Sequence, residues 1–226
     1  NELTAYGFNH QDVKSSDNTA IVVGAESLKR DGTLYVLAIG VNQYKNSDYN
    51  LNFAVKDVVE IGKALQDSQA KLGDAKQYAK TEVITLTNKS ATKENILNAL
   101  GRFAKGDKTA IPENISDELK AEFSKIKQTQ PEDALVIYFA GHGVSKKQRF
   151  YLLPHNFTGD ADLLESQSVS DLELNEYLEM VDAGKILMTI DACQSGQALG
   201  GKNDGKAPMN SKGFAQLAYD KGMFIL

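Results

Sequence analysis

Uninterrupted apolar runs recur along the chain from about residue 34 onward. Such runs are typical of β-strands that are covered on both faces, as in a parallel sheet flanked by helices. The clearest lie at 34–40, 82–87, 133–140 and 185–191, with a shorter one at 150–154 and another beginning at 222–226. This pattern predicts a sheet whose strands are mostly parallel.

The segments between these runs carry apolar residues at every third or fourth position, as helices with one buried face do. The stripes predict helices at 53–65, around Ile96–Phe103, within the polar segment 105–131, at 170–181 and at 214–220. Asn88–Thr92 supplies capping side chains before the second helix, and Ser170 with Glu173 forms a capping box. The helix within 105–131 is expected to pack on the outside of the domain.

Strands that alternate with helices predict an α/β domain with right-handed crossovers. We expect this domain to span 34–226, with a mostly parallel central sheet and helices on both faces. Residues 1–33 are polar and contain one short apolar run, Ala20–Gly24. They are interpreted as an N-terminal arm or linker with at most one edge strand.

Composition narrows the classes of protein to consider. With 226 residues, 42% of them hydrophobic, the chain can build one large core. The 25 basic and 30 acidic residues form no basic stripe, so nucleic acid is not an expected partner. No apolar run approaches the ~18 residues that would indicate a membrane-spanning helix.

The single cysteine excludes an internal disulfide and is compatible with a cytoplasmic location. The chain begins at Asn1 rather than Met and stops in an apolar run, so both ends are interpreted as cuts in a longer protein.

Two of the predicted strands lead into reactive side chains. His142 lies in Gly141-His142-Gly143 after one strand, and Cys193 follows another strand 51 residues later. Because neighbouring parallel strands end at the same edge of a sheet, the two side chains can approach each other. Imidazole is the usual base that activates a thiol. The backbone N–H groups of Gly143 and Cys193 are candidates for an oxyanion hole.

Each feature alone has a simpler explanation. A single cysteine at a strand end is more often a small buried hydrophobic residue, and Gly-His-Gly is more often a turn. Both motifs together, each directly after an apolar strand, favour a catalytic Cys–His dyad.

The two motifs, Tyr138-Phe-Ala-Gly-His-Gly143 and Ile190-Asp-Ala-Cys-Gln-Ser-Gly196, resemble those of the caspase-like cysteine peptidases, which include metacaspases and paracaspases. A histidine about 50 residues before the cysteine is also typical of caspases. Three further segments resemble the family: Val36–Tyr44, Leu51–Asp57 and Tyr151–Pro154. The resemblance covers about 34–226 and is closest to bacterial members.

This resemblance implies a caspase-like three-layer sandwich and endopeptidase activity on protein or peptide substrates. An acyl-enzyme would form on Cys193, with His142 acting first as base and then as acid, and the chemistry needs no metal or other cofactor. Bacterial members often carry sensor or repeat domains. In the family, a small-subunit segment completes the sheet beyond the point where this chain stops.

The residue two positions before the cysteine indicates which bond is cut. Asp191 stands where caspases have glutamine, and alternate strand residues share a face, so its carboxylate should point toward the same cleft as Cys193. In metacaspases, this acid and one in the first helix, matched here by Asp57, form a pocket for Arg or Lys. The alternatives are a solvated carboxylate in the first turn of the helix for Asp57 and a strand-end hydrogen-bond acceptor for Asp191.

Three weaker assignments remain. The loop 196–213 contains Lys202, Lys206 and Lys212, at which a basic-specific enzyme could process itself; a plain solvated loop is the alternative. Some metacaspases are activated by calcium, and Asp160 and Asp162 are candidate ligands, although their spacing forms no recognised calcium loop. The other two histidines, His10 and His155, are interpreted as solvated.

Two other functions fit the same fold. A caspase-like scaffold or signalling domain without activity would keep the sheet and lack a formed cleft. A flavodoxin-like nucleotide-binding domain would share the sheet, but no Gly-x-Gly-x-x-Gly or Walker A pattern follows a strand. A cysteine endopeptidase is therefore the leading hypothesis.

Overall fold

The computed structural model describes residues 2–11, 13–16, 18–21, 30–146, 149–194 and 224–225. They form two compact units, Asn1–Asp31 and Gly32–Leu226. In the first unit, β1 (Glu2–Ala5) pairs antiparallel with β2 (Asn18–Ile21). The expected arm is therefore a short hairpin with two strands rather than one. Its first strand carries no apolar run, which is why the hydrophobic pattern missed it.

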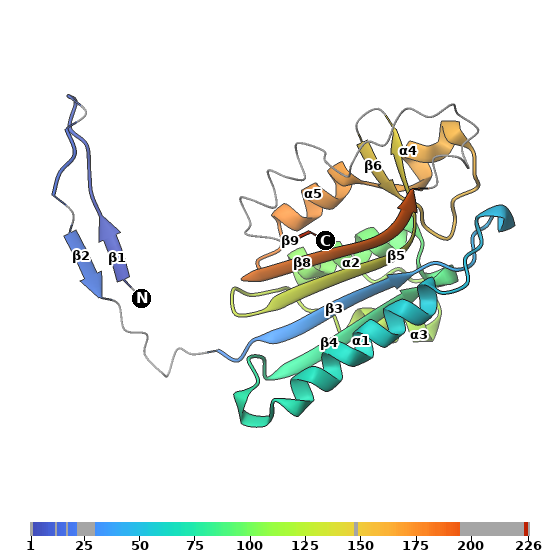
Figure 1. Ribbon diagram of the computed structural model, residues 1–226, viewed down its shortest axis with the longest axis horizontal. Helices are drawn as coiled ribbons and strands as arrows, with labels where there is room; N and C mark the ends of the chain where they lie inside the picture. The colour runs from blue at the N-terminus through green and yellow to red at the C-terminus, as the bar shows by residue number, and fades with distance from the viewer. Residues whose placement is uncertain are drawn as a thin grey trace. The chain divides into compact units, whose positions relative to one another are not determined.

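The second unit is built on a seven-stranded sheet (Figure 1). Five strands are parallel: β4 (Lys80–Thr87), β3 (Thr33–Gly40), β5 (Ala134–Lys146), β8 (Lys185–Gln194) and β9 (Phe224–Ile225), each paired with the next in this order. Two shorter strands are antiparallel: β6 (Arg149–Leu152) pairs with the end of β5, and β7 (Val169–Ser170) pairs with β6. The sheet is thus mixed, with a parallel centre.

Helices cover both faces of this sheet (Figure 1). One face carries α1 (Ala54–Lys71), and the other carries α2 (Lys93–Lys105), α3 (Asp117–Ser124) and α5 (Asp171–Glu179). A further helix, α4 (Leu164–Gln167), is a single turn. Among the described residues, 3₁₀ turns lie at Ser47–Tyr49, Gly73–Ala75, Asn88–Ser90, Gly106–Lys108 and Ala161–Leu163. The three-layer α/β fold expected from the sequence is confirmed.

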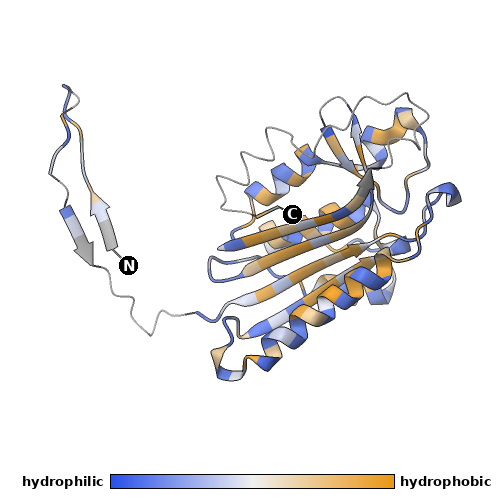
Figure 2. Cartoon of the chain, in the orientation of Figure 1, coloured by the Kyte–Doolittle hydropathy of each residue, from blue (hydrophilic) through white to orange (hydrophobic). Residues whose placement is uncertain are grey.

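Strand β3 explains how the layers are held together. Its residues alternate, so Tyr35, Leu37 and Ile39 join the main core with α2, whereas Leu34, Val36 and Ala38 face the layer of α1. Figure 2 shows the central strands as mostly hydrophobic along their length. At Gly40, a Cβ atom would lie 2.7 Å from the Val58 side chain, so only glycine lets α1 pack this closely.

Three elements differ from the sequence prediction. Helix α1 extends to Lys71 instead of ending near 65. The helix α3 does not pack on the outside, because Leu119, Phe123 and the following Ile126 are buried in the main core. The predicted loop 196–213 and helix 214–220 lie outside the described residues, and the last predicted strand is described only at Phe224–Ile225.

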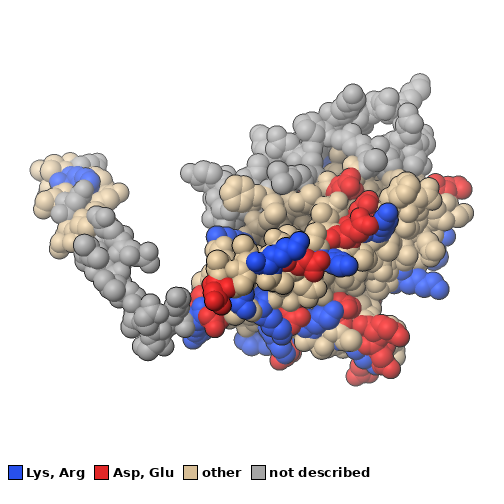
Figure 3. Space-filling view, turned by 60° about the horizontal axis from the view of Figure 1, so that its bottom comes forward, with Lys and Arg blue, Asp and Glu red and all other residues tan. Residues whose placement is uncertain are grey.

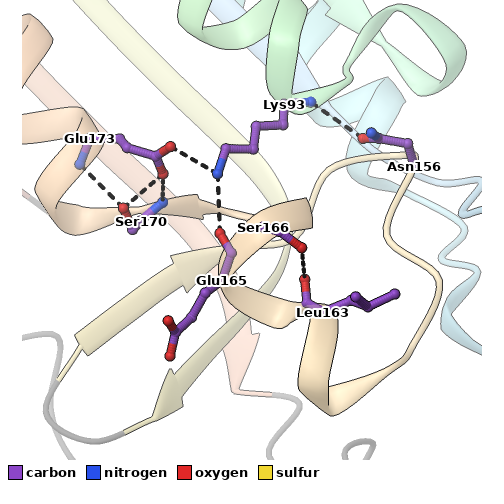
Figure 4. A network of polar contacts seen from close by, with 7 residues as sticks. All are labelled: Lys93, Asn156, Leu163, Glu165, Ser166, Ser170 and Glu173. Carbon is purple, nitrogen blue, oxygen red and sulfur yellow. Dashed lines mark hydrogen bonds and ion pairs between the residues drawn. The ribbon is translucent and has the colours of Figure 1, made fainter.

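A network of polar contacts joins α2 to α5 and to the segment before α5 (Figure 4). The Lys93 ammonium lies 2.8 Å from Glu173 Oε1 and donates to the Glu165 carbonyl at 3.1 Å. The other Glu173 oxygen accepts from the Ser170 N–H and hydroxyl, at 2.9 and 2.7 Å, and the Glu173 N–H donates back to Ser170 Oγ. This is the capping box expected from the sequence, extended by an ion pair.

The surface carries both signs of charge. Lysine and arginine are interspersed with aspartate and glutamate on the face drawn in Figure 3. One ion pair, Lys56–Glu60, lies one turn apart on α1. Within the part of the chain that is described, no helix combines the length and the apolar character needed to cross a membrane.

Candidate active site

Strands β5 and β8 bring His142 and Cys193 side by side. The two residues are direct partners in the parallel register, two positions beyond the pair Ala140 and Asp191. The backbone of Cys193 is described, whereas its side chain lies outside the described part of the structure. His142 does not follow the strand, as the sequence suggested, but lies inside it. The reason is that β5 continues past the end of β3 by pairing with β8 on one side and β6 on the other.

The loop after β3 fixes the His142 imidazole. His142 Nε2 lies 2.8 Å from the backbone carbonyl of Tyr49. A carbonyl oxygen can only accept a hydrogen bond, so in the neutral imidazole Nε2 carries the proton and Nδ1 carries the lone pair. Nδ1 is buried, and no described atom forms a hydrogen bond to it. The nitrogen that can take up a proton is therefore held away from water.

Two tyrosines enclose the same ring. The Tyr44 ring centroid lies 5.2 Å from that of His142, and the Tyr49 ring lies 5.8 Å away in an edge-on arrangement. The Tyr44 hydroxyl also accepts the His142 backbone N–H at 2.8 Å. Burial raises the pKa of Tyr44, so this hydroxyl stays protonated.

Burial also lowers the pKa of His142 below its ordinary value, and the hydrogen bond to the Tyr49 carbonyl only partly offsets this effect. The imidazole is therefore neutral near pH 7. A neutral imidazole with an available lone pair can act as a general base.

Asparagine side chains shape the loop that presents Tyr49. Asn46 Oδ1 accepts the Asp48 N–H at 3.0 Å, and Asn50 Oδ1 accepts the Tyr44 N–H at 2.8 Å. The Tyr49 ring then packs on Phe157, which is fully buried. Short amides that bond to nearby backbone are the usual means of fixing irregular turns. The position of the carbonyl that orients His142 is thus set by local chemistry.

Two carboxylates lie on the α1 side of the same strands. The Tyr138 hydroxyl donates to Asp191 Oδ2 at 3.3 Å. Burial raises the pKa of Tyr138, and the negative charges of Asp191 and, to a smaller extent, Asp57 add to the increase. Asp191 is exposed, and Asp57 is half-buried in the first turn of α1. The pair forms a negative site that a cation can reach.

Gly143 fits a crowded position next to His142. A Cβ atom there would lie 2.6 Å from the Phe150 ring and 3.1 Å from Ala192 Cβ. Gly143 is paired with Leu152 on β6 and with Gln194 on β8. Glycine therefore allows β6 to close over the strand that carries His142.

Four of the other sequence candidates, Asp160, Asp162, His10 and His155, lie in the described part of the chain. Asp160 accepts the Asp162 N–H at 2.9 Å and caps a 3₁₀ turn. Among the described residues, no group of three or more histidine, cysteine or acidic side chains could hold a metal. His10 is exposed, and His155 is partly buried, with its Nδ1 2.5 Å from the Gln43 carbonyl. Lys202, Lys206 and Lys212 lie outside the described residues.

Comparison of the sequence with known families identifies the family of this chain. The sequence model described as "Metacaspase, peptidase C14 domain" matches residues 36–201, which include both His142 and Cys193. The chain belongs to the metacaspase family. This family assigns it to the cysteine peptidases and agrees with the caspase-like fold expected from the motifs.

The chain was also compared with curated proteins and with solved structures. A search of curated proteins gave no match. Among solved structures, the chain is similar to the crystal structure of protein GSU0716 from Geobacter sulfurreducens, with 19% sequence identity and a TM-score of 0.46. That similarity covers 73% of this chain and 52% of the other, so this chain spans about half the length of the solved structure.

Sequence reasoning missed three tyrosines of the metacaspase site. Tyr138 could have been found, because it lies four residues before His142 on the same strand and therefore on the same face. Tyr44 and Tyr49 lie in a loop without periodicity. Tyr49 acts through its backbone carbonyl, which every residue possesses, so no side-chain signal marks it.

Proposed function

We propose that this metacaspase is a cysteine endopeptidase that uses a Cys193–His142 dyad and cleaves after Arg or Lys. The observation that carries the proposal is the direct pairing of the two residues across β5 and β8, with the His142 lone pair on the buried Nδ1. A buried base beside a cysteine is the arrangement that thiol activation needs.

In the proposed reaction, the Cys193 sulfur bonds to the substrate carbonyl carbon and its proton passes to His142 Nδ1. The peptide C–N bond then breaks as His142 returns this proton to the leaving amine, which leaves a thioester. Water attacks the thioester after losing a proton to His142, and Cys193 regains its proton when the acid product departs. No metal or other cofactor takes part in these steps.

The backbone N–H groups of Gly143 and Cys193 are the proposed oxyanion-hole donors. They lie on neighbouring strands, beside the pair that supplies base and nucleophile. Backbone N–H groups on a rigid sheet need little reorganisation when negative charge develops on the substrate oxygen.

The preference for Arg or Lys rests on Asp191 and Asp57. Asp191 accepts the Tyr138 hydroxyl proton and is two residues before Cys193 on β8, and the charges of both carboxylates raise the pKa of Tyr138. A carboxylate there attracts a cationic P1 side chain and repels an acidic one. The P1 residue is the one whose carbonyl Cys193 attacks, and alternate residues of a strand share a face, which supports selection of the P1 side chain by Asp191.

Fluorogenic peptides that differ only at P1 test this proposal. We expect cleavage of the Arg and Lys peptides, none of the Asp peptide, and no activity in Cys193→Ala with any peptide. Each peptide is assayed with and without calcium, because some metacaspases are activated by calcium that binds to their acidic residues. A preference for P1 Asp would contradict the assignment of Asp191, and cleavage by Cys193→Ala would contradict the nucleophile.

We further propose that the enzyme processes itself at Lys202, Lys206 or Lys212. This proposal rests on the sequence, because these lysines are the substrate type that the Asp191 site prefers. Intact-mass spectrometry of the wild type and Cys193→Ala tests it. We expect shorter products only in the wild type, and identical masses would contradict self-processing.

A further inference from the structure

Asn88 has an unusual backbone conformation at the end of β4. Its φ is 46°, and it is the only non-glycine residue with positive φ in the described part of the chain. This region is unfavourable for most side chains, and asparagine is among the few that tolerate it. Asn88 begins the 3₁₀ turn Asn88–Ser90. Because the turn itself needs no such residue, the conformation calls for another explanation.

The side chain of Asn88 supplies that explanation. Its Oδ1 accepts two backbone hydrogen bonds, from the Asn42 N–H and from the Gln43 N–H, both at 2.9 Å. These are residues 45 and 46 positions away in sequence, at the beginning of the loop that follows β3. One amide oxygen therefore fixes the point at which the chain turns away from the sheet toward Tyr44.

Asn42 in turn accepts hydrogen bonds from the far end of the loop and from α1. Its carbonyl accepts the Leu51 N–H at 2.8 Å, and its Oδ1 accepts the Val55 N–H at the start of α1 at 3.1 Å. The beginning and the end of the loop are therefore tied together at Asn42. Between these ties lie Tyr44, which accepts the His142 N–H, and Tyr49, whose carbonyl binds the ring.

We propose that Asn88 is a positioning residue for His142. By holding Asn42 and Gln43, it keeps the Tyr49 carbonyl in place, and this carbonyl keeps the proton on Nε2 and the lone pair on Nδ1. Asn88 touches neither substrate nor the reacting atoms. The kinetic consequence rests on the proposed peptidase function, whereas the effect on the ring does not.

Other contacts limit the size of the effect. The Lys45 N–H donates to the His155 carbonyl at 2.8 Å, and His155 Nδ1 lies near the Gln43 carbonyl, so the loop has a second attachment. Loss of the Asn88 oxygen should loosen the loop without releasing it. We therefore expect a fall in kcat of about 10-fold, or 1.4 kcal/mol in the activation barrier.

Two substitutions separate the side chain from the backbone conformation. Asn88→Gly keeps a residue that adopts positive φ without strain but removes the accepting oxygen. Asn88→Asp keeps the oxygen and also tolerates positive φ. With a P1 Arg peptide, we expect Asn88→Gly to lower kcat about 10-fold with little change in KM, and Asn88→Asp to stay near the wild type.

Asn98→Ala is a matched control, because Asn98 lies on α2, outside this loop, and donates one hydrogen bond, to the Ala110 carbonyl. Its kcat should equal that of the wild type. All rates are compared at a temperature at which every variant is fully folded by circular dichroism, so a lower melting temperature of Asn88→Gly does not obscure the result.

Nitrogen NMR of the histidine rings gives a readout that needs no activity. The chain has three histidines, and His142→Gln identifies the signals of His142. At a pH where the imidazole is neutral, we expect protonation at Nε2 in the wild type and in Asn88→Asp, and a mixture of tautomers in Asn88→Gly. If the wild type cleaves no peptide, the proposed function fails while this experiment still tests Asn88.

Two results would overturn the inference. One is a His142 tautomer in Asn88→Gly that is unchanged from the wild type. The other is an Asn88→Asp variant that behaves like Asn88→Gly, since the accepting oxygen would then not be the cause.

Discussion

Two polar regions of this domain differ in how completely their charged and polar groups are paired. In the Lys93 network, the ammonium contacts both a carboxylate and a carbonyl, and each Glu173 oxygen has a partner (Figure 4). Burial raises the pKa of Glu173, but the hydrogen bonds from Lys93 and Ser170 outweigh it and the net pKa is lowered. At His142, one ring nitrogen is bound by Tyr49, whereas Nδ1 is buried without a hydrogen-bond partner among the described residues.

This difference distinguishes polar groups that stabilise the fold from a polar group that is available for chemistry. A fully paired network stabilises the fold, because each group regains in the protein the hydrogen bonds it loses from water. A buried lone pair without a partner costs stability and is retained where a proton must be taken up. The comparison predicts that substitutions at His142 change activity and that substitutions at Lys93 change stability.

The largest effect is expected from the dyad. His142→Ala and Cys193→Ala should each lower kcat/KM by at least about 1,000-fold, because neither thiolate formation nor acyl transfer can proceed. His142→Ala removes the unpaired Nδ1 together with the hydrogen bond to the Tyr49 carbonyl, so these two effects on the melting temperature partly cancel. Steady-state kinetics and thermal unfolding measure both quantities. Retention of a tenth of the activity by His142→Ala would contradict the assignment.

A smaller effect is expected from the P1 site. Asp191→Asn keeps the shape of the side chain and removes its charge, so kcat/KM for Arg and Lys peptides should fall roughly 10- to 100-fold. Asp57→Asn should act in the same direction. An uncharged P1 peptide, such as one with Gln, serves as control and should lose no more than about 3-fold. Equal losses on charged and uncharged peptides would show that charge is not the cause.

Substitution in the Lys93 network should lower stability and leave activity nearly unchanged. Lys93→Met leaves Glu173 without its cation and should lower the free energy of unfolding by about 2 kcal/mol. The value of kcat should change by less than about 2-fold, because the network does not contact the loop at Tyr49. Urea unfolding and kinetics on the same preparations make the measurement. If Lys93→Met had the same free energy of unfolding as the wild type, the claim that this network stabilises the fold would be contradicted.

The smallest effect concerns pH. Burial favours the neutral form of His142, so protonation in the folded protein requires a pH below the ordinary value of 6.5. The acid limb of kcat/KM should therefore fall below pH 6.5, with full activity above it. The lowered pKa of His142 also makes the free energy of unfolding fall slightly as the pH drops below 6.5. The reason is that the histidine in the unfolded chain binds a proton at a higher pH than His142 in the folded protein. An acid limb above pH 6.5 would contradict the burial of the imidazole.

The repeating features of the chain could be predicted from the sequence. The central strands, the capping box at Ser170 and the three-layer α/β fold follow from hydrophobic periodicity and local capping chemistry. The prediction that His142 and Cys193 approach each other used only the fact that neighbouring parallel strands end together. Their direct register agrees with that expectation.

The features that the sequence did not reveal depend on tertiary contacts. The extension of β5 through His142 requires β6 and β8 as partners, which are distant in sequence. The burial of Phe123 depends on where α3 docks, and amphipathicity alone does not tell a core helix from a peripheral one. The Tyr49 carbonyl and the Asn88 oxygen act through backbone groups of a loop, where no periodic signal exists.

One measurement tests the dyad most directly. Cys193 is the only cysteine, so any thiol adduct reports on this residue alone. An Arg-based acylating probe should add one label per wild-type chain by intact-mass spectrometry, and His142→Ala should react far more slowly. Iodoacetamide in denaturant, which labels both proteins equally, controls for an intact thiol. Equal labelling of the two folded proteins by the Arg probe would contradict activation of Cys193 by His142.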